Sequence, residues 1–409
     1  RALELVLTWP PGEPRALSEL VVRMLKGASL VATAGYGSEA ARDEFEAVIG
    51  LTEVLGPRPE SIGVQLAIMA FATVRGLRAR AGEIIDGLNT QLATASEDEA
   101  MLYGAEVTVS DALHRYGLGD YNRARQQFEH AIELFLARPP GFTASPLWTL
   151  PNSPVVAAYA QLVPVLWVQG ERSAASEAGA RALELSGELG FPSGPFSEAY
   201  SRAYLGYMYQ LEGDSARAVE EFRNVTILGT RHGFAMWEGL GSIHALIAAA
   251  HLELTPETVR AIGHTRLVLH QLGVSSFQPY FVTAQAELTA DLGDLDTALG
   301  LFDEAIALSE ELEERHYLAE TFRKRAVARA RGAMDAEKVA ADLARAFEIA
   351  RDQGAFLFQV RAAIDMHRLL DPGSRPALAS EALASARSVL ELSVSYPEAE
   401  QAAVLFANT

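Results

Sequence analysis

The chain has 409 residues, with 34 lysines and arginines against 53 aspartates and glutamates, so its formal net charge is −19. This charge argues against nucleic acid as a partner, because phosphate binding needs a basic face. The chain has no cysteine, which excludes disulfides, Cys-ligated zinc and thiol nucleophiles. No apolar run approaches the ~18 residues of a membrane span. We expect a cytoplasmic protein with no membrane contact. Because the chain begins at Arg1, we also expect it to be part of something longer.

Apolar residues recur with the 3.6-residue period of an α-helix almost throughout the chain, and no stretch alternates as a β-strand does. Residues 120–136, for example, place Tyr121, Ala124, Phe128 and Ala131 on one stripe. We therefore predict an all-α protein. The predicted helix pairs are 19–55, 60–94, 98–137, 152–189, 195–231, 235–273, 277–312, 315–352 and 355–393, and residues 394–409 hold a C-terminal capping helix.

The pairs share an internal layout that is measured from a glycine at the turn between the two helices. After Gly119 come Ala124 at +5, Phe128 at +9 and Ala131 at +12. The glycine ends the first helix, the small residue lets two helices approach, and the bulky residue fills the groove between them. One pair cannot bury its apolar face alone, so neighbouring pairs must stack. The same register follows Gly76, Gly213 and Gly293, and it follows Gly170 with Gly179 in the bulky position.

This layout resembles the tetratricopeptide repeat (TPR), which implies a right-handed superhelical solenoid of about nine or ten helix pairs over residues 1–409. The glycines at 76, 119, 170 and 213 are spaced by 43, 51 and 43 residues. Ordinary TPRs repeat at about 34 residues, so the helices or loops are longer here.

One stretch reads as a true loop. Residues 137–153 contain four prolines, Pro139, Pro140, Pro146 and Pro151, and proline blocks helix interiors. A loop of this length inside a compact repeat array is often functional. We expect an insertion that either contributes to a binding site through Trp148 or lies over the solenoid with Trp148 as its apolar anchor.

Three segments resemble the helical array that follows the ATPase module of large bacterial regulators: LuxR/MalT-type activators, predicted ATPases linked to adenylate or guanylate cyclases, and related Ser/Thr kinases. The segment 317–332 carries the matching Ala319, Glu320 and Arg323, and departs at Thr321 and Ala326. The opening segment 1–56 matches at Arg1 to Leu5, Pro10, Pro11, Arg15, Glu19, Leu20 and Gly27. The segment 352–370 matches at Gln353, Gly354, Ala355, Arg361, Ala362, Ala363, Arg368 and Leu369, and departs at Gln359.

The resemblance implies the sensor region of a signal-transducing (STAND-type) ATPase regulator, with the ATPase and the output domain outside this chain. The sequence is consistent with an ATPase that lies outside this chain. No Gly-x4-Gly-Lys-Ser/Thr loop is present, and the only lysines are Lys26, Lys324 and Lys338, which excludes a P-loop.

Other chemical signals are weak. The Gly-x-Gly segments 35–40 and 239–244 lack the third glycine of a dinucleotide site, and we interpret them as close-packing positions. His244 and His251 share a helix face without a third ligand or a Cys, so packing is the better interpretation. We expect no enzyme active site, no cofactor and no metal in this chain.

The concave groove is the better place to look for a binding site. In the TPR register, the first helix of each pair lines that groove, and aromatic side chains with polar tips suit recognition. The alternative is that these aromatics only pack between neighbouring helices. The groove candidates are Trp167, Tyr200, Tyr207, Gln210, Tyr280 and Glu287, with His114, Tyr116, Arg202 and Trp237 as neighbours.

We expect a non-catalytic domain that binds a peptide, protein or small-molecule inducer in this groove and shifts against its own ATPase module. Two other functions stay open. One is a free-standing TPR adaptor with no ATPase attached, and the other is an enzyme that uses residues 137–153 as a lid.

Overall fold

The computed structural model describes residues 1–34, 38–56, 61–139, 142, 152–332 and 336–374, together with 380, 383, 384, 398, 401, 404 and 405. Within these residues there are α-helices and one short 3₁₀ helix but no β-strand. The helices are α1 (Ala2–Leu7), α2 (Glu13–Ala34), α3 (Glu39–Leu55), α4 (Ser61–Val74), α5 (Arg78–Leu92), α6 (Glu97–Leu118), α7 (Tyr121–Leu136), α8 (Pro154–Val168), α9 (Arg172–Gly187), α10 (Ser193–Glu212), α11 (Ser215–His232), α12 (Ala235–Ala250), α13 (Pro256–Gln271), α14 (Gln278–Asp291), α15 (Leu295–Glu311), α16 (Leu318–Arg331), α17 (Ala336–Gln353), α18 (Phe356–Leu369) and η1 (Pro372–Ser374).

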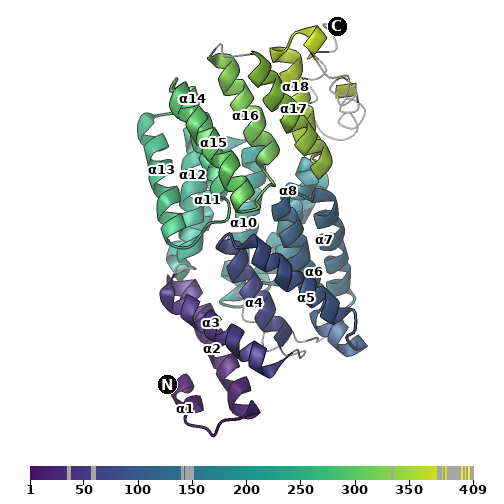
Figure 1. The fold of residues 1–409 in the computed structure, drawn as a ribbon, viewed down its shortest axis with the longest axis vertical. Helices are drawn as coiled ribbons and strands as arrows, with labels where there is room; N and C mark the ends of the chain where they lie inside the picture. Colours follow the sequence, from purple (N-terminus) through teal and green to yellow (C-terminus); the bar gives the residue numbers. More distant parts are fainter. Residues whose placement is uncertain are drawn as a thin grey trace.

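The helices pack as consecutive antiparallel pairs, from α2 with α3 to α16 with α17, and the pairs wind into a superhelix (Figure 1). The predicted all-α solenoid is confirmed. Helices α1–α3 lie at one end of the long axis and α16–α18 at the other. None of the helices in the described ranges is long and apolar enough to cross a membrane.

The glycine register is visible in the backbone. The five marking glycines adopt φ between 75° and 91°, the left-handed region that only glycine enters without strain. Directly after three of them, the side chain of an aspartate caps the next helix by accepting a hydrogen bond from the N–H three residues on. These glycines are Gly76, Gly119, Gly170, Gly213 and Gly293, and the caps are Asp120, Asp214 and Asp294.

The +5, +9 and +12 positions form the interior of the array. Ala124, Phe128 and Ala131 have no exposed surface, and the residues at the same positions after Gly76, Gly213 and Gly293 are at most 1% exposed. At the exceptional Gly179, a Cβ atom would lie 2.4 Å from Cδ2 of Leu205. Leu205, from the neighbouring α10, therefore fills the space that a bulky residue fills in the other pairs.

The Gly-x-Gly of residues 239–244 is a close-packing position, as interpreted from the sequence. A Cβ atom on Gly241 would lie 2.6 Å from Oγ1 and 2.7 Å from the backbone N of Thr226. We expect Gly241→Ala to lower the free energy of unfolding by about 1–3 kcal/mol, because α11 and α12 must move apart. Urea denaturation measures this change.

Gly87 provides the matched control. It is exposed on α5, and a Cβ atom there would have nothing within 4 Å. Gly87→Ala should raise the free energy of unfolding by about 0.5–1 kcal/mol, since alanine loses less backbone entropy in a helix. Equal effects of the two substitutions would contradict the close-packing interpretation of Gly241.

Two sequence predictions fall largely on residues that the structure does not describe. Of the expected loop insertion 137–153, residues 140, 141 and 143–151 lie outside the described ranges, and so does most of the expected capping helix 394–409. Both stay predictions, as does the division of the chain into one solenoid with these two additions.

Candidate functional site in the concave channel

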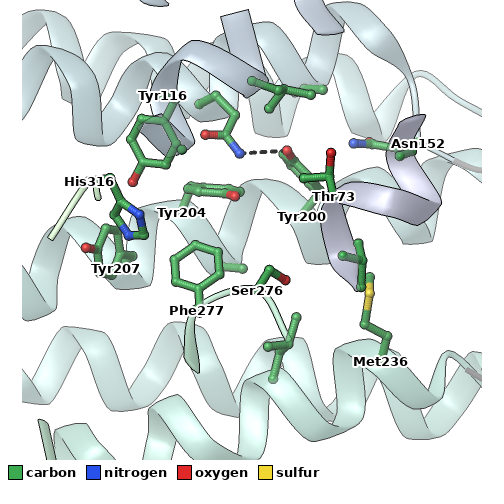
Figure 2. Close-up of a pocket in the computed structure, with 18 of the residues that line it drawn as sticks. Thr73, Tyr116, Asn152, Tyr200, Tyr204, Tyr207, Met236, Ser276, Phe277 and His316 are labelled. Carbon is green, nitrogen blue, oxygen red and sulfur yellow. Dashed lines mark hydrogen bonds between the residues drawn. The ribbon is translucent and has the colours of Figure 1, made fainter. Parts of the chain in front are cut away.

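The first helices of the pairs line a channel that contains two adjoining cavities. The first cavity, of about 210 Å³, lies between α4, α6, α8, α10 and α12 and the turns that precede α14 and α16. Figure 2 shows Tyr204 and Phe277 facing each other near its middle, with Tyr116 and His316 at one end and Thr73, Tyr200 and Asn152 at the other. We call it the aromatic pocket because its wall includes Tyr116, Phe196, Tyr200, Tyr204, Tyr207, Phe222, Trp237, His244, Phe277 and His316.

The aromatic pocket is assembled from repeats that are far apart in the sequence. The carbonyl oxygen of Val74, at the end of α4, accepts hydrogen bonds from the backbone N–H groups of Ser275 and Ser276 at 2.8 and 3.0 Å. The carbonyl of Gly117 accepts a third, from the N–H of Arg315 at 2.8 Å. These closure contacts join the second and third helix pairs to the turns before α14 and α16. They place Phe277 and His316 opposite α4 and α6.

Several polar atoms at the aromatic pocket are buried and have no hydrogen-bond partner within the described residues. Such atoms are rare in folded proteins, and each one costs about 1–3 kcal/mol. Arg78 and Glu314 form an ion pair, with 3.6 Å between Nη2 and Oε2, which is too long for a hydrogen bond. The unpaired atoms are Thr73 Oγ1, Arg78 Nε, Tyr116 Oη, Gln161 Oε1, Trp237 Nε1, Glu314 Oε2 and both ring nitrogens of His316. The residues around this cavity therefore combine aromatic rings with polar atoms that no other described residue satisfies.

Tyr116 tests this interpretation. Its hydroxyl is unpaired on a side chain that is 5% exposed. We expect Tyr116→Phe to leave the free energy of unfolding unchanged or to raise it by up to about 1 kcal/mol, because no hydrogen bond is lost. The control is Tyr121→Phe. The Tyr121 hydroxyl donates to the carbonyl of His316 at 2.6 Å, so its loss should cost about 1–3 kcal/mol. Thermal or urea unfolding compares the two, and a similar loss in both would contradict the prediction.

The second cavity, of about 440 Å³, is polar, and we call it the charged pocket. Three of its cations, Arg323, Lys324 and Arg361, are paired with carboxylates. Arg323 contacts Asp365 through Nη1 at 2.6 Å and Lys324 pairs with Glu287. Its charged wall consists of Glu212, Glu287, Arg323, Lys324, Arg361, Asp365, Arg368 and Glu398.

Three of the predicted groove residues form the wall between the two pockets. The Gln210 side chain accepts hydrogen bonds from the Tyr280 hydroxyl at 3.0 Å and from Nδ1 of His244 at 2.8 Å. Tyr207 meets Tyr280 edge to face, with 5.2 Å between ring centroids. Tyr207 faces the aromatic pocket, while Gln210 and Tyr280 face the charged pocket. His244, considered in the sequence as a metal ligand, also stacks on the Phe222 ring at 4.4 Å.

The other predicted residues lie in different places. Tyr200 lines the aromatic pocket, where its hydroxyl accepts a hydrogen bond from Nε2 of Gln161 at 2.7 Å, dashed in Figure 2. Glu287 lines the charged pocket. Trp167 lines neither pocket; it is 1% exposed, and the Arg361 guanidinium lies over its ring. Trp148 lies outside the described residues. Of the neighbours that were named, Tyr116 and Trp237 line the aromatic pocket, and His114 and Arg202 do not.

Sequence reasoning missed the polar end of the aromatic pocket. Arg78 follows the turn after α4, and Glu314 and His316 stand in the turn before α16. The groove prediction counts only positions within the first helix of a pair, so it misses Arg78 at the start of a second helix and Glu314 and His316 in a turn between pairs. They reach the pocket only because the superhelix closes on itself, which depends on its pitch.

Burial controls the charge of the pocket walls. It lowers the pKa of His244 to about 3, and burial together with the nearby Arg78 lowers the pKa of His316 to about 3. Both imidazoles are therefore neutral at pH 7. Burial raises the pKa of Tyr200 to about 12. It also raises the pKa of Glu314 above its usual range, since it outweighs the opposing effect of Arg78.

The fold and the lined channel define the class of this protein: it is a TPR-like helical-repeat solenoid. Among solved structures, it is similar to a Rap protein in complex with Competence and Sporulation Factor, with a TM-score of 0.57 and 10% identity over 95% of this chain and 96% of that one. It is also similar to the APC/C hetero-tetramer Cut9–Hcn1, with a TM-score of 0.53 and 12% identity over 100% of this chain and 66% of that one.

At the level of sequence, no protein-family model matches the chain. The uncharacterized protein R02095 of Rhizobium meliloti (strain 1021) is 29% identical over 214 residues. The matched segment is 51% of this chain and 20% of that relative. The chain therefore spans about a fifth of the length of the curated relative that it matches.

Proposed function

We propose that this chain is a non-catalytic sensing and interaction domain that binds a peptide, protein or small-molecule effector in its concave channel. The observation that carries the proposal is the group of unpaired buried polar atoms around the aromatic pocket, since a bound effector would satisfy them. The similar Rap protein, whose structure holds Competence and Sporulation Factor, supports a binding role for a solenoid of this shape.

We further propose that the domain belongs to a larger bacterial ATPase regulator of the LuxR/MalT or cyclase-linked kind. Two observations support this: the family resemblance of the segments 1–56, 317–332 and 352–370, and the much greater length of the Rhizobium relative. A free-standing adaptor is the second candidate, and the likeness to the Cut9 solenoid of the Cut9–Hcn1 assembly favours it.

The closure contacts supply a route from binding to signalling. The aromatic pocket is shared by α4 and α6 on one side and the turns before α14 and α16 on the other. An effector that contacts both sides binds the closed arrangement more tightly than an opened one, and so shifts the population toward it. An attached module that contacts one end of the solenoid would then respond to the change.

The test is recovery of the effector. The chain is purified from its native cells, denatured, and the released small molecules and peptides are identified by mass spectrometry. We expect one species at about one copy per chain, and its absence from a variant whose aromatic pocket is filled, Ala203→Trp. A chain that carries nothing, and that is not stabilised against heat by an extract of its own cells, would contradict the proposal.

The size of the native gene product distinguishes the regulator proposal from the free-standing adaptor. An immunoblot of the native cell extract should show a product much longer than 409 residues if the regulator proposal is right. A product of the present length, together with capture of a protein partner without added nucleotide, would favour the adaptor.

A further inference from the structure

The described residues that line the aromatic pocket carry no net charge. Arg78 and Glu314 are the only charged side chains among them, they are 4% and 2% exposed, and they oppose each other at 3.6 Å. The lining histidines, His244 and His316, are held neutral by burial. An ionised ligand would lose its hydration without gaining an opposite charge, which is costly.

The unpaired polar atoms lie at the two ends of the pocket rather than around its middle. At one end, His316 stacks on Tyr116 and lies beside Glu314, with 3.6 Å between Nδ1 and Oε1. At the other end, Trp237 meets Tyr200 edge to face at 5.6 Å, and Gln161 is bonded to the same tyrosine. Both ends therefore offer donors and acceptors. Figure 2 shows Tyr204, Phe277 and Ser276 between the ends, so the middle of the wall combines two aromatic rings with hydroxyl groups.

Volume sets the size of the occupant. Pockets for drug-sized ligands measure about 300–1,000 Å³, and the aromatic pocket has about 210 Å³. It is too small for a folded peptide and suits a molecule of one or two rings. A sugar is a poor match, because it needs hydrogen-bond partners around its whole rim, whereas aromatic side chains supply much of this wall.

We propose that the aromatic pocket binds one small, uncharged, ring-based molecule with a hydrogen-bonding group at each end. This inference rests on the proposed function and names the chemical class of its effector. The rings stack on Tyr204, Tyr207 and Phe277, one polar group meets Tyr116 and His316, and the other meets Gln161 and Trp237.

The first experiment uses defined probes. Titration calorimetry on the whole chain compares two neutral diols, 2,6-dihydroxynaphthalene and 4,4′-dihydroxybiphenyl, with the dicarboxylates of the same two ring systems. We expect at least one diol to bind at one site per chain. The matching dicarboxylate should bind at least about tenfold more weakly, because each 1.4 kcal/mol of desolvation cost weakens binding tenfold.

Four variants assign the site. Ala203→Trp places a large side chain in the aromatic pocket and should abolish binding of the diol. Ser215→Trp places the same side chain at the charged pocket, and Ala174→Trp places it at a half-buried alanine outside both pockets. Binding should survive in both controls. Tyr116→Phe, which keeps the shape of the pocket, should weaken binding about three- to tenfold, the equivalent of one hydrogen bond. It stands in for Ala203→Trp if that variant does not fold.

The outcomes separate this inference from the proposed function. Tighter binding of the dicarboxylates, or loss of diol binding in Ser215→Trp but not in Ala203→Trp, would overturn the inference. Recovery of a charged molecule or a peptide from the native chain, with no diol bound, would also overturn it while leaving the proposed function intact. Failure of both proposals would appear as no diol binding and no recovered effector.

Discussion

Replacing Glu320 by glutamine should lower the free energy of unfolding by about 3–5 kcal/mol, the usual cost of breaking a buried ion pair from one side. The Glu320 carboxylate is fully buried on α16. It accepts hydrogen bonds from Nε and Nη2 of Arg323 at 2.6 and 2.9 Å and from Nη1 of Arg361 at 3.3 Å. Without its charge, two guanidinium groups repel each other in the interior. Urea denaturation at pH 7 gives the loss.

The matched control is an ion pair near the surface. Glu129 contacts Nε of Arg125 at 2.8 Å, and its side chain is 48% exposed. Glu129→Gln should cost less than about 1 kcal/mol, because water screens the pair. If Glu320→Gln cost no more than this control, the network around Glu320 would not hold α16 and α18 together.

Lowering the pH from 7 to 5 should lower the free energy of unfolding, and two buried histidines, His244 and His316, should contribute about 2 kcal/mol each to this loss. Burial lowers the pKa of His244 to about 3, and burial with Arg78 lowers that of His316 equally. In the unfolded chain both titrate near 6.5. Between these values the unfolded state binds more protons. Stability is therefore complete above about pH 6.5 and is lost as the pH falls toward 3.

His316→Phe provides the control, because neither ring nitrogen of His316 has a hydrogen-bond partner in the described residues. The variant should keep its stability at pH 7 and, on lowering the pH to 5, should lose about 2 kcal/mol less than the wild type. Other groups add to or oppose this loss: desolvation also lowers the pKa of His114 and of His251, whereas burial raises the pKa of Glu314, which acts in the opposite direction. Equal losses in the wild type and the variant would contradict the assignment to His316.

The sequence was a good guide to everything that is local. The first eight predicted pairs and the glycine register hold because a left-handed turn, a cap and a close contact between two helices depend on residues within about 15 positions of one another. Of the ninth predicted pair, 355–393, the structure describes the first helix, α18. The structure also shows what some residues of the family resemblance contribute to stability. Glu320, Arg323 and Arg361 form the buried ion network that ties α16 to α18.

The binding site was only partly predictable. Tyr200 and Tyr207 were found because they stand on the first helix of a pair, and both line the aromatic pocket. Arg78, Glu314 and His316 were not, since they reach the pocket through contacts across a turn of the superhelix. The binding role of all the groove candidates, Trp148 included, stays a prediction.

The closure contacts also change how the array should unfold. Repeat proteins usually gain stability from neighbours alone, so they can fray from either end one unit at a time. Here the Tyr121 hydroxyl is bonded to a carbonyl 195 residues further along, and Val74 and Gly117 make similar long-range bonds. Such contacts couple the second and third helix pairs to the turns before α14 and α16, and they slow folding through their high contact order. Removing the repeats from α14 onward would thus open the aromatic pocket on the side away from α4 and α6.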